Sequence, residues 1–341
     1  MAERIWVDGM EIIAEVGVHH EGRVDLACNY IDSLIGIADI VKFQMYDADS
    51  LCQKESPVYW RTIAKSQYDI FSKKKTMTFD EWALVRDYAK EQGIKFCITP
   101  FSLKYVDWCE KLGVDAIKIA SADITYKQLL KAINATGKQV YMSTGGATSG
   151  EIWQALDCLL NCHVVPMHCS LIYPSTMSDA RLGRFRMLRS IFPTMNWGYS
   201  CHVANNWESI VVAMRTLGAT TLEKHYTLDK TLPGDDHYHS MDREDLIKLR
   251  ETLTGIESSM DNDSLLQKEV QNVREARRAL VLTKDLPCGT ILLEEDLGAL
   301  RPAHGISPML YKEFIGKALR VDKKKGEMIQ WKDAMPVSEF K

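Results

Sequence analysis

Eight short apolar runs, separated by stretches with helical spacing, constrain the fold of this 341-residue chain more than any other feature. One helical stretch, 78–93, has Thr78 and Glu81 at the spacing of a capping box and Gly93 at its end, and another covers 151–161. Apolar strands that alternate with helices predict a parallel sheet buried on both faces. Eight such units favour a (β/α)8 TIM barrel, with a doubly wound open sheet as the alternative. The runs cover 11–18, 38–46, 94–101, 116–121, 139–145, 163–170, 195–202 and 220–227.

The pattern changes near residue 258, where a polar stretch begins. We predict a barrel over 1–258, a linker over 259–276 and a small β-rich domain over 277–341. Within this last part, "DLPCGTILLEED" (285–296) and "DKKKGEMIQWKD" (322–333) both place Gly four positions after Asp and a second Asp seven positions later. The short repeat suggests two related, hairpin-like halves.

Composition narrows the classes of partner. No run of about 18 apolar residues is present and the start lacks the order of a signal peptide, so we expect no membrane association. Nine cysteines without CxxC pairs suit reduced thiols in the cytoplasm. A net charge of −4 argues against nucleic acid as the main partner, but it does not argue against a small anion.

Polar side chains gather where the predicted strands end, and in a barrel these ends converge on the catalytic face. Lys42 in "IVKFQ" and Lys118 in "AIKIAS" lie among apolar neighbours, where a charge is costly unless it is paired. Binding of a phosphate or carboxylate and structural ion pairs are both open explanations. The full set is Glu15, Lys42, Gln44, Thr99, Lys118, Ser121, Asp123, Ser143, Thr144, His168, Ser170, Tyr173, Ser200, His202, Glu223, Lys224 and His225.

His202 and His225 end consecutive predicted strands, so their rings can converge on one divalent ion. Two histidines are a weak metal signal, because neutral core histidines are common. Both interpretations stay open from the residues alone.

Several motifs, in this order, resemble those of the sialic acid synthases, a family that includes N-acetylneuraminate synthase and bacterial nonulosonate synthases. They are "IIAEVGVHHEG", "VKFQ", "KIASAD", "STGG", "HCSLIYP", "GYSCH" and "LEKHYTLDKTLPGDDH". The tail from "RRALVLTKDLPCGT" to "IGKALRVDKKKGE" resembles the antifreeze-like SAF domain, a β-clip fold, of these enzymes. The resemblance covers nearly the whole chain and is specific through the joint occurrence of its motifs.

The resemblance implies condensation of phosphoenolpyruvate with an N-acylated amino sugar of the N-acetylmannosamine type, giving a nonulosonic acid and phosphate. It implies that Mn²⁺ or Mg²⁺ is held by His202 and His225. It also implies a domain-swapped homodimer in which Arg301 of the SAF domain reaches the sugar bound by a partner subunit. For catalysis we assign Glu15, Asp123 and Lys224. The remaining assignments are Lys42, Thr99, Lys118, Ser121, Ser143 and Ser200 for phosphoenolpyruvate, and Gln44, Tyr173 and Asp236 for the sugar.

Three departures from the family pattern make a changed acceptor sugar more plausible: His19 in place of Asn, Leu171 in place of Asn and Cys201 in place of Asp. A loop at 226–235 is expected to close the barrel mouth, with Pro233 and Gly234 shaping a turn that presents Asp236. We interpret His237 and His239 as loop residues that line the sugar site.

Two alternatives share these residues. One is a phosphoenolpyruvate-condensing synthase of seven- or eight-carbon keto acids on the same barrel. The other is a non-catalytic carbohydrate-binding protein that kept the fold.

Overall fold

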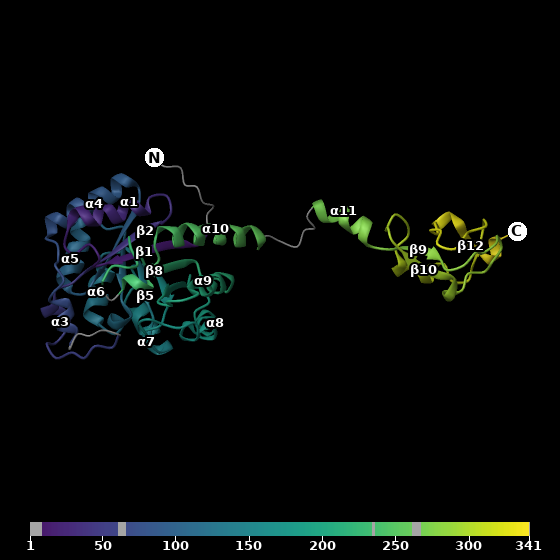
Figure 1. The fold of residues 1–341 in the computed structure, drawn as a ribbon. Helices are drawn as coiled ribbons and strands as arrows, with labels where there is room; N and C mark the ends of the chain where they lie inside the picture. The colour runs from purple at the N-terminus through teal and green to yellow at the C-terminus, as the bar shows by residue number, and fades with distance from the viewer. Residues whose placement is uncertain (1–8, 61–65, 234–235, 261–266, 341) are drawn as a thin grey trace. The chain divides into compact units, whose positions relative to one another are not determined.

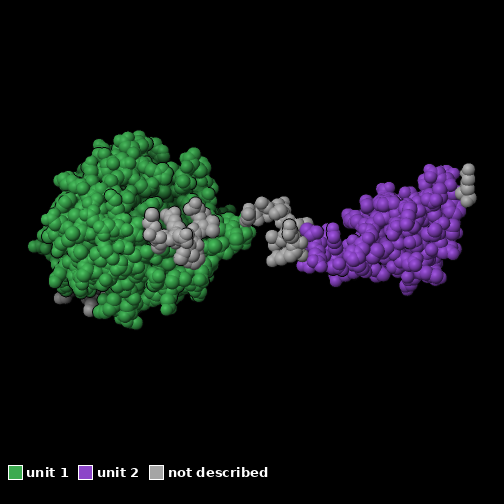
Figure 2. Space-filling model, turned by 90° about the horizontal axis from the view of Figure 1, so that it is seen from above, with its two compact units in different colours: residues 1–260 green, residues 261–341 purple. Residues whose placement is uncertain are grey.

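The protein is represented by a computed structural model that describes residues 9–60, 66–233, 236–260 and 267–340. The chain divides into two compact units, residues 1–260 and 261–341 (Figure 2). Of the predicted linker, residues 261–266 lie outside the described residues and Gln267–Ala276 forms helix α11.

The first unit is a closed barrel of eight parallel strands in sequence order, β1 to β8 (Figure 1). This confirms the predicted TIM barrel and excludes the open sheet. Each strand lies within the apolar run predicted for it and is one to four residues shorter, since the runs extend into the loops. The strands are Glu11–Gly17, Ile40–Met45, Lys95–Pro100, Ala116–Ile119, Gln139–Ser143, His163–His168, Gly198–Cys201 and Thr221–His225.

Helices connect the strands and cover the barrel. Helix α4 has the predicted capping box, with the Thr78 hydroxyl accepting from the Glu81 N–H, and it ends at Gly93 with φ 76°. Helix α7 begins before the predicted stretch, because Thr148 and Glu151 form a second capping box, and it ends at Asp157. The helices of this unit are α1 Val24–Leu34, α2 Ala48–Leu51, α3 Gln67–Phe71, α4 Phe79–Gln92, α5 Leu103–Leu112, α6 Lys127–Ala135, α7 Ser149–Asp157, α8 Leu182–Ile191, α9 Trp207–Thr216 and α10 Arg243–Ser259.

The barrel interior has an apolar layer below a polar one. A separate buried cluster consists of Ile13, Ile40, Cys97, Ala116, Tyr141, Val165 and Met167. Successive side chains of a strand point to opposite sides, so the residue two positions further along the strand points the same way. On five strands that residue is polar: Glu15, Lys42, Thr99, Lys118 and Ser143. The apolar layer therefore closes the barrel beneath a polar floor at the carboxyl ends of the strands.

The second unit repeats one small motif. Its strands β9 Ala279–Leu282 and β10 Leu297–Leu300 form one antiparallel pair, and β11 Lys317–Leu319 and β12 Ala334–Pro336 form another. Asp285 accepts from the Lys325 N–H and Asp322 from the Cys288 N–H, each at 2.8 Å. Asp285 in the first half of the repeat thus holds the turn of the second half, and Asp322 in the second half holds the turn of the first. The sequence repeat is therefore also a structural repeat with reciprocal contacts.

Candidate active site

A cavity of about 400 Å³ opens at the carboxyl ends of the barrel strands. It brings together residues predicted from seven different strands and the loops that follow them. The predicted residues that line it are Glu15, Lys42, Gln44, Thr99, Lys118, Ser121, Asp123, Ser143, Tyr173, Ser200, His202, His225 and Asp236.

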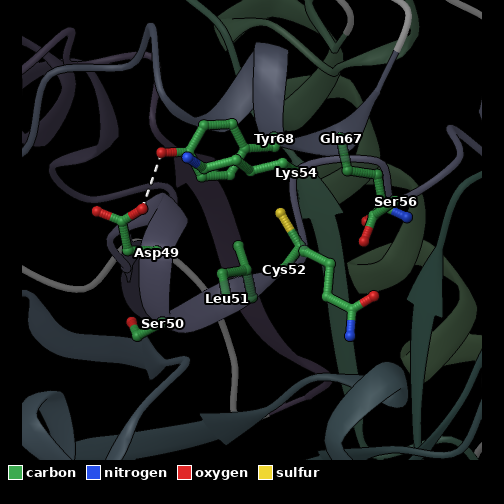
Figure 3. A pocket seen from close by; sticks show the side chains of 9 residues that line it. Asp49, Ser50, Leu51, Cys52, Lys54, Ser56, Gln67 and Tyr68 are labelled. Atoms are coloured by element: carbon green, nitrogen blue, oxygen red, sulfur yellow. Dashed lines mark hydrogen bonds between the residues drawn. The ribbon is translucent and has the colours of Figure 1, made fainter.

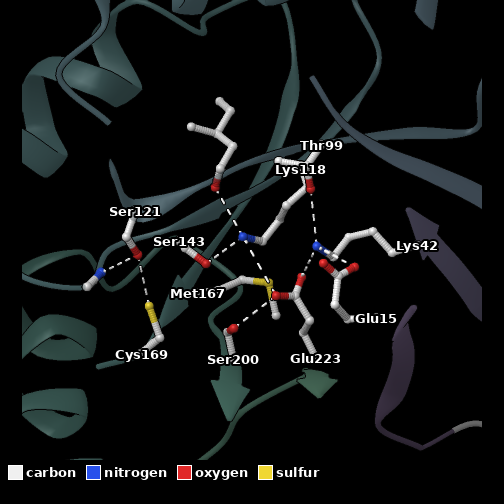
Figure 4. A network of polar contacts seen from close by, with 12 residues as sticks. Glu15, Lys42, Thr99, Lys118, Ser121, Ser143, Met167, Cys169, Ser200 and Glu223 are labelled. Atoms are coloured by element: carbon white, nitrogen blue, oxygen red, sulfur yellow. Dashed lines mark hydrogen bonds and ion pairs between the residues drawn. The ribbon is translucent and has the colours of Figure 1, made fainter. Parts of the chain in front are cut away.

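Two buried lysines lie at the floor of this cavity (Figure 4). The Lys42 ammonium contacts the Glu15 carboxylate at 2.7 Å and donates to the Thr99 hydroxyl at 3.1 Å. The Lys118 ammonium donates to the Ser143 hydroxyl at 2.6 Å. Strand pairing places these groups on neighbouring strands, so an anion could contact both ammonium groups and both hydroxyls.

Glu223 links the two lysines and lines the cavity, although the sequence-based assignment gave it no role. Its carboxylate accepts from the Ser200 hydroxyl at 2.9 Å and lies 3.6 Å from the Lys42 ammonium and 3.8 Å from that of Lys118. The structure therefore shows the ion pairs that were one explanation for the lysines. Anion binding, the other explanation, stays a prediction, and both lysines line the cavity where an anion could bind. A substrate anion would have to share or replace the contacts with Glu223.

The charges of the cluster follow from burial and pairing. Although burial would raise the pKa of Glu223, Lys118 and Lys42 lower it to about 2, so this carboxylate is ionised. Burial raises the pKa of Glu15, and the nearby Lys42 only partly offsets this. Burial would lower the pKa of Lys42, but Glu15 and Glu223 raise it above its usual value. Glu15 is thus the carboxyl of the cluster that accepts a proton most easily.

Lys224, predicted to be catalytic, does not reach the cavity. Its ammonium donates to the Val203 carbonyl at 3.0 Å and lies 4.9 Å from the centre of the Trp207 ring. The reason is the alternation along β8: Glu223 and His225 line the cavity and Lys224, between them, points the other way. The assignment of Lys224 to catalysis is therefore corrected, and Glu223 takes its place in the site.

The Ser121 hydroxyl is held at the cavity edge. It accepts from the Gly145 N–H at 2.9 Å and lies 3.1 Å from the Cys169 sulfur (Figure 4). A Cβ at position 145 would lie 2.8 Å from this hydroxyl, so only glycine permits the contact. The loop after β5 therefore fixes a hydroxyl that belongs to the loop after β4.

His202 and His225 lie beside each other, with ring centres 5.9 Å apart. The Nδ1–H of His202 donates to the Ser170 carbonyl at 2.7 Å, which leaves the lone pair on Nε2. Nδ1 of His225 is buried and has no hydrogen-bond partner. Burial lowers the pKa of His202 to about 3 and that of His225 to about 4, so both rings are neutral. Neutral imidazoles with free lone pairs fit a divalent cation.

Among the described residues, no third side chain completes this donor set. In the part of the chain that the structure describes, no group of three or more His, Cys, Asp and Glu side chains could hold a metal ion. A cation here would have two protein ligands, and its other positions would be open to water and substrate.

Three further side chains form the polar side of the cavity next to these histidines. The His19 and His237 rings stack with centres 3.9 Å apart. The Nδ1 atom of His19 is hydrogen-bonded to the Tyr226 carbonyl, and that of His237 is hydrogen-bonded to the Thr227 hydroxyl. Asp236 contacts His239, and although burial would raise its pKa, His225 and His239 hold that pKa below its usual range. His239 does not line the cavity, whereas His237 does, as predicted. Gly234, predicted to shape the turn, lies outside the described residues.

Asp123 and Tyr173 come from the loops after β4 and β6. Burial raises the pKa of Asp123 to about 6, against the opposing effect of Lys118, and one of its carboxylate oxygens is buried without a partner. The Tyr173 ring lies against His202, with centres 4.1 Å apart. Arg301 is exposed in the second unit, and its predicted contact with a bound sugar stays a prediction.

Comparisons with known proteins identify relatives of this chain. The sequence model of the NeuB family matches residues 34–264, and that of the SAF domain matches residues 277–335. The chain is 34% identical to an N,N'-diacetyllegionaminic acid synthase of Campylobacter jejuni, over 94% of this chain and 98% of that one. It is 32% identical to the Legionella pneumophila protein of the same name, over 94% and 93%. The structure is similar to that of an N-acetylneuraminic acid synthetase from Leptospira borgpetersenii in complex with citrate, with a TM-score of 0.67 and 28% identity over 77% of this chain and 91% of that one.

Proposed function

Because the chain belongs to the NeuB family and is a sialic acid synthase-type enzyme with a C-terminal SAF domain, we propose that it condenses phosphoenolpyruvate with an N-acetylmannosamine-type sugar. The products would be a nonulosonic acid and phosphate. The relatives named as diacetyllegionaminic acid synthases support a product of this class. The observation that carries the proposal is the pair of buried lysines, each with a hydroxyl partner, at the floor of the cavity.

In the proposed reaction, the floor binds phosphoenolpyruvate. Lys42 and Lys118 neutralise its charges, and Thr99, Ser121 and Ser143 donate hydrogen bonds to its oxygens. Ser200 would donate as well once its hydroxyl releases Glu223. The ammonium groups also stabilise phosphate as it leaves, because they are fixed in a buried site before the reaction begins.

Carbon C3 of phosphoenolpyruvate attacks the aldehyde carbon of the open-chain sugar, and C2 acquires positive character. Water then adds at C2, and the tetrahedral intermediate expels phosphate by C–O cleavage. Glu15 and Asp123 are the proposed carboxyls for proton transfer, since both line the cavity and burial raises the pKa of each. Gln44 donates to Glu15 at 2.6 Å and fixes the orientation of its carboxyl group.

His202 and His225 would hold Mn²⁺ or Mg²⁺, which would polarise the sugar aldehyde. Tyr173 and Asp236, which lie beside these histidines, would orient the sugar. The binding of a metal is a proposal supported by the neutral, converging imidazoles.

The proposal extends to assembly and location. We propose a domain-swapped homodimer in which Arg301 reaches the sugar on a partner subunit, because the family resemblance implies it. A cytoplasmic location is supported by nine free cysteines. In the described part of the chain, no helix has the length and apolar character needed to cross a membrane.

The test supplies purified protein with phosphoenolpyruvate, Mn²⁺ or Mg²⁺ and N-acetylated amino sugars, and measures phosphate release and keto acid formation. We expect phosphate release that depends on the sugar and is lost in Lys42→Met and Lys118→Met. If the folded, metal-loaded protein releases no phosphate with any acceptor, the proposed function is wrong. Release with seven- or eight-carbon products only would instead support the alternative acceptor class.

A further inference from the structure

His239 is a buried histidine beside the cavity that has no part in the proposed reaction. It belongs to the short 3₁₀ helix His237–His239 in the loop after β8, and it is only 2% exposed. It does not line the cavity, but it contacts two residues that do. Its Nε2 atom lies 3.2 Å from a carboxylate oxygen of Asp236, and its ring centre lies 5.2 Å from that of His225. His239 therefore supports the cavity from behind.

The direction of the hydrogen bond to Asp236 follows from its acceptor. A carboxylate only accepts, so Nε2 of His239 carries the hydrogen and donates it. The other ring nitrogen, Nδ1, is buried and has no hydrogen-bond partner within the described part of the chain. A buried polar atom without a partner costs free energy, which an apolar ring of similar size would avoid. Packing alone therefore does not explain a histidine at position 239.

The backbone around Asp236 is fixed, but its side chain is free on the cavity side. The Ser240 hydroxyl donates to the Asp236 carbonyl at 2.5 Å. The Met241 N–H donates to the His225 carbonyl at 2.8 Å, which ties this loop to the end of β8. The Asp236 side chain faces the open cavity and stays 38% exposed. The hydrogen bond from His239 is thus the contact that selects one orientation of this carboxylate.

A carboxylate with a fixed orientation binds a ligand better than one that rotates. Fixing it before the ligand arrives removes part of the entropy cost of binding. Asp236 shares the cavity with His202 and His225, the two imidazoles that fit a cation. Its negative charge favours a cation there, and its oxygens can accept a hydrogen bond from a sugar hydroxyl.

We propose that His239 is a positioning residue. Its Nε2–H holds the Asp236 carboxylate on the side of the cavity where His225 lies. In this orientation the carboxylate strengthens the binding of a divalent cation and of the acceptor sugar. The inference rests on the proposed function and adds a residue that acts only through Asp236.

Three substitutions at position 239 separate the donor from the shape of the ring. His239→Phe keeps a ring and removes the donor. His239→Gln places an N–H two bonds beyond Cγ, as in the histidine, whereas the N–H of His239→Asn lies too close to the backbone to reach Asp236. The first readout is the Mn²⁺ affinity of the substrate-free protein, measured from the electron paramagnetic resonance signal of free Mn²⁺. We expect His239→Phe and His239→Asn to lower this affinity about 10-fold and His239→Gln to stay within about threefold of wild type.

The second readout is the pair of KM values. The KM for the sugar should rise about 10-fold in His239→Phe, the loss expected for one misplaced hydrogen bond to a charged group. The KM for phosphoenolpyruvate should not change, because His239 contacts neither lysine of the cavity floor. In an Asp236→Ala background, adding His239→Phe should change the Mn²⁺ affinity by less than about twofold, since the residue through which His239 acts is already absent.

The matched control is Tyr68→Phe, which removes another ring donor to an aspartate. Tyr68 of α3 donates to Asp49 of α2 at 2.8 Å, and neither residue lines the cavity (Figure 3). This variant should leave the Mn²⁺ affinity and both KM values unchanged.

Equal Mn²⁺ affinity and equal sugar KM in His239→Phe and wild type would overturn the inference. So would a His239→Gln variant as weak as His239→Asn, and this comparison still decides if His239→Phe does not fold. Absence of phosphate release by wild type would refute the proposed function, while the Mn²⁺ titrations would still decide the role of His239.

Discussion

Replacing Glu223 with glutamine tests the charge balance at the floor of the cavity. The variant keeps the shape of the side chain but removes the negative charge that lies 3.6 Å from Lys42 and 3.8 Å from Lys118. Lys42 would still have a counter-charge in the variant, because its ammonium lies 2.7 Å from the Glu15 carboxylate. Lys118 has no other carboxylate within ion-pair distance among the described residues. Its ammonium would therefore be buried without a counter-charge.

The size of the effect follows from these distances. At an effective dielectric constant of about 20, each contact is worth about 4 to 5 kcal/mol of Coulomb energy, most of which offsets the cost of burying the charges. Removing one partner of a buried pair typically costs about 3 to 5 kcal/mol. Burial already lowers the pKa of Lys118, so its ammonium can release a proton in the variant. We therefore expect a loss of stability at the lower end of this range, about 3 kcal/mol. For a domain of this size, about 3 kcal/mol corresponds to a decrease in Tm of roughly 6 to 12 °C.

The assay is thermal unfolding of wild type and Glu223→Gln with increasing inorganic phosphate. Phosphate should stabilise the variant more than the wild type, because it supplies the missing negative charge and need not compete with Glu223. The control is Asp107→Asn, which breaks an exposed ion pair with Lys111 and should change Tm by about 1 °C with no added response to phosphate. An unchanged Tm together with an equal phosphate response would refute the proposed role of Glu223.

Three further predictions concern single groups. Lys224→Met should destabilise the protein by about 1 to 2 kcal/mol, because it loses the contacts with Val203 and Trp207. The KM for phosphoenolpyruvate should stay the same. A tenfold rise in that KM would show that Lys224 acts in the active site after all. The folded-state pKa of Asp123 is raised to about 6, so its ionisation opposes folding as pH rises. In denaturant titrations, Asp123→Asn should therefore match wild type in stability below pH 4 and exceed it by about 1 to 2 kcal/mol above pH 6. An equal difference in stability at all pH values would contradict this. Removal of metal by a chelator should abolish phosphate release. Added Mn²⁺ or Mg²⁺ should restore phosphate release in wild type and not in His225→Ala. Full activity after chelation would exclude the metal proposal.

The fold was predictable because strand and helix signals repeat with clear spacing. Thr78, Glu81 and Gly93 mark the two ends of α4 as the sequence predicts, since capping is a local interaction. The eight strands followed from runs of apolar residues, as expected for a sheet buried on both faces. The same double burial hides which side of a strand faces the barrel interior. Both sides of such a strand are apolar over most of its length, so the sequence does not show which side faces the barrel interior. The position of Glu223 and Lys224 at the end of β8 was therefore not enough to tell which of the two lines the cavity.

The alternation of polar and apolar layers could have resolved this ambiguity. Position 15 follows Ile13 by two residues, position 42 follows Ile40 and position 118 follows Ala116, and these apolar residues form the closed layer beneath the site. Counting in steps of two from the carboxyl end of β8 links His225 to Glu223 and excludes Lys224. A single assumption, that the histidine faces the cavity, would therefore have identified Glu223 from sequence.

The aromatic side chains that line the cavity, by contrast, could not be recognised from sequence. They are Tyr46, Tyr59, Trp60, Phe71, Phe101 and Tyr173. They come from the residue after β2, the chain between α2 and α3, helix α3 and the loops after β3 and β6, and no spacing relates them. The polar floor is set by strand register, so a count in steps of two along each strand finds its residues. These rings lie outside the regular strands, where only the folded structure shows which side chains face the cavity.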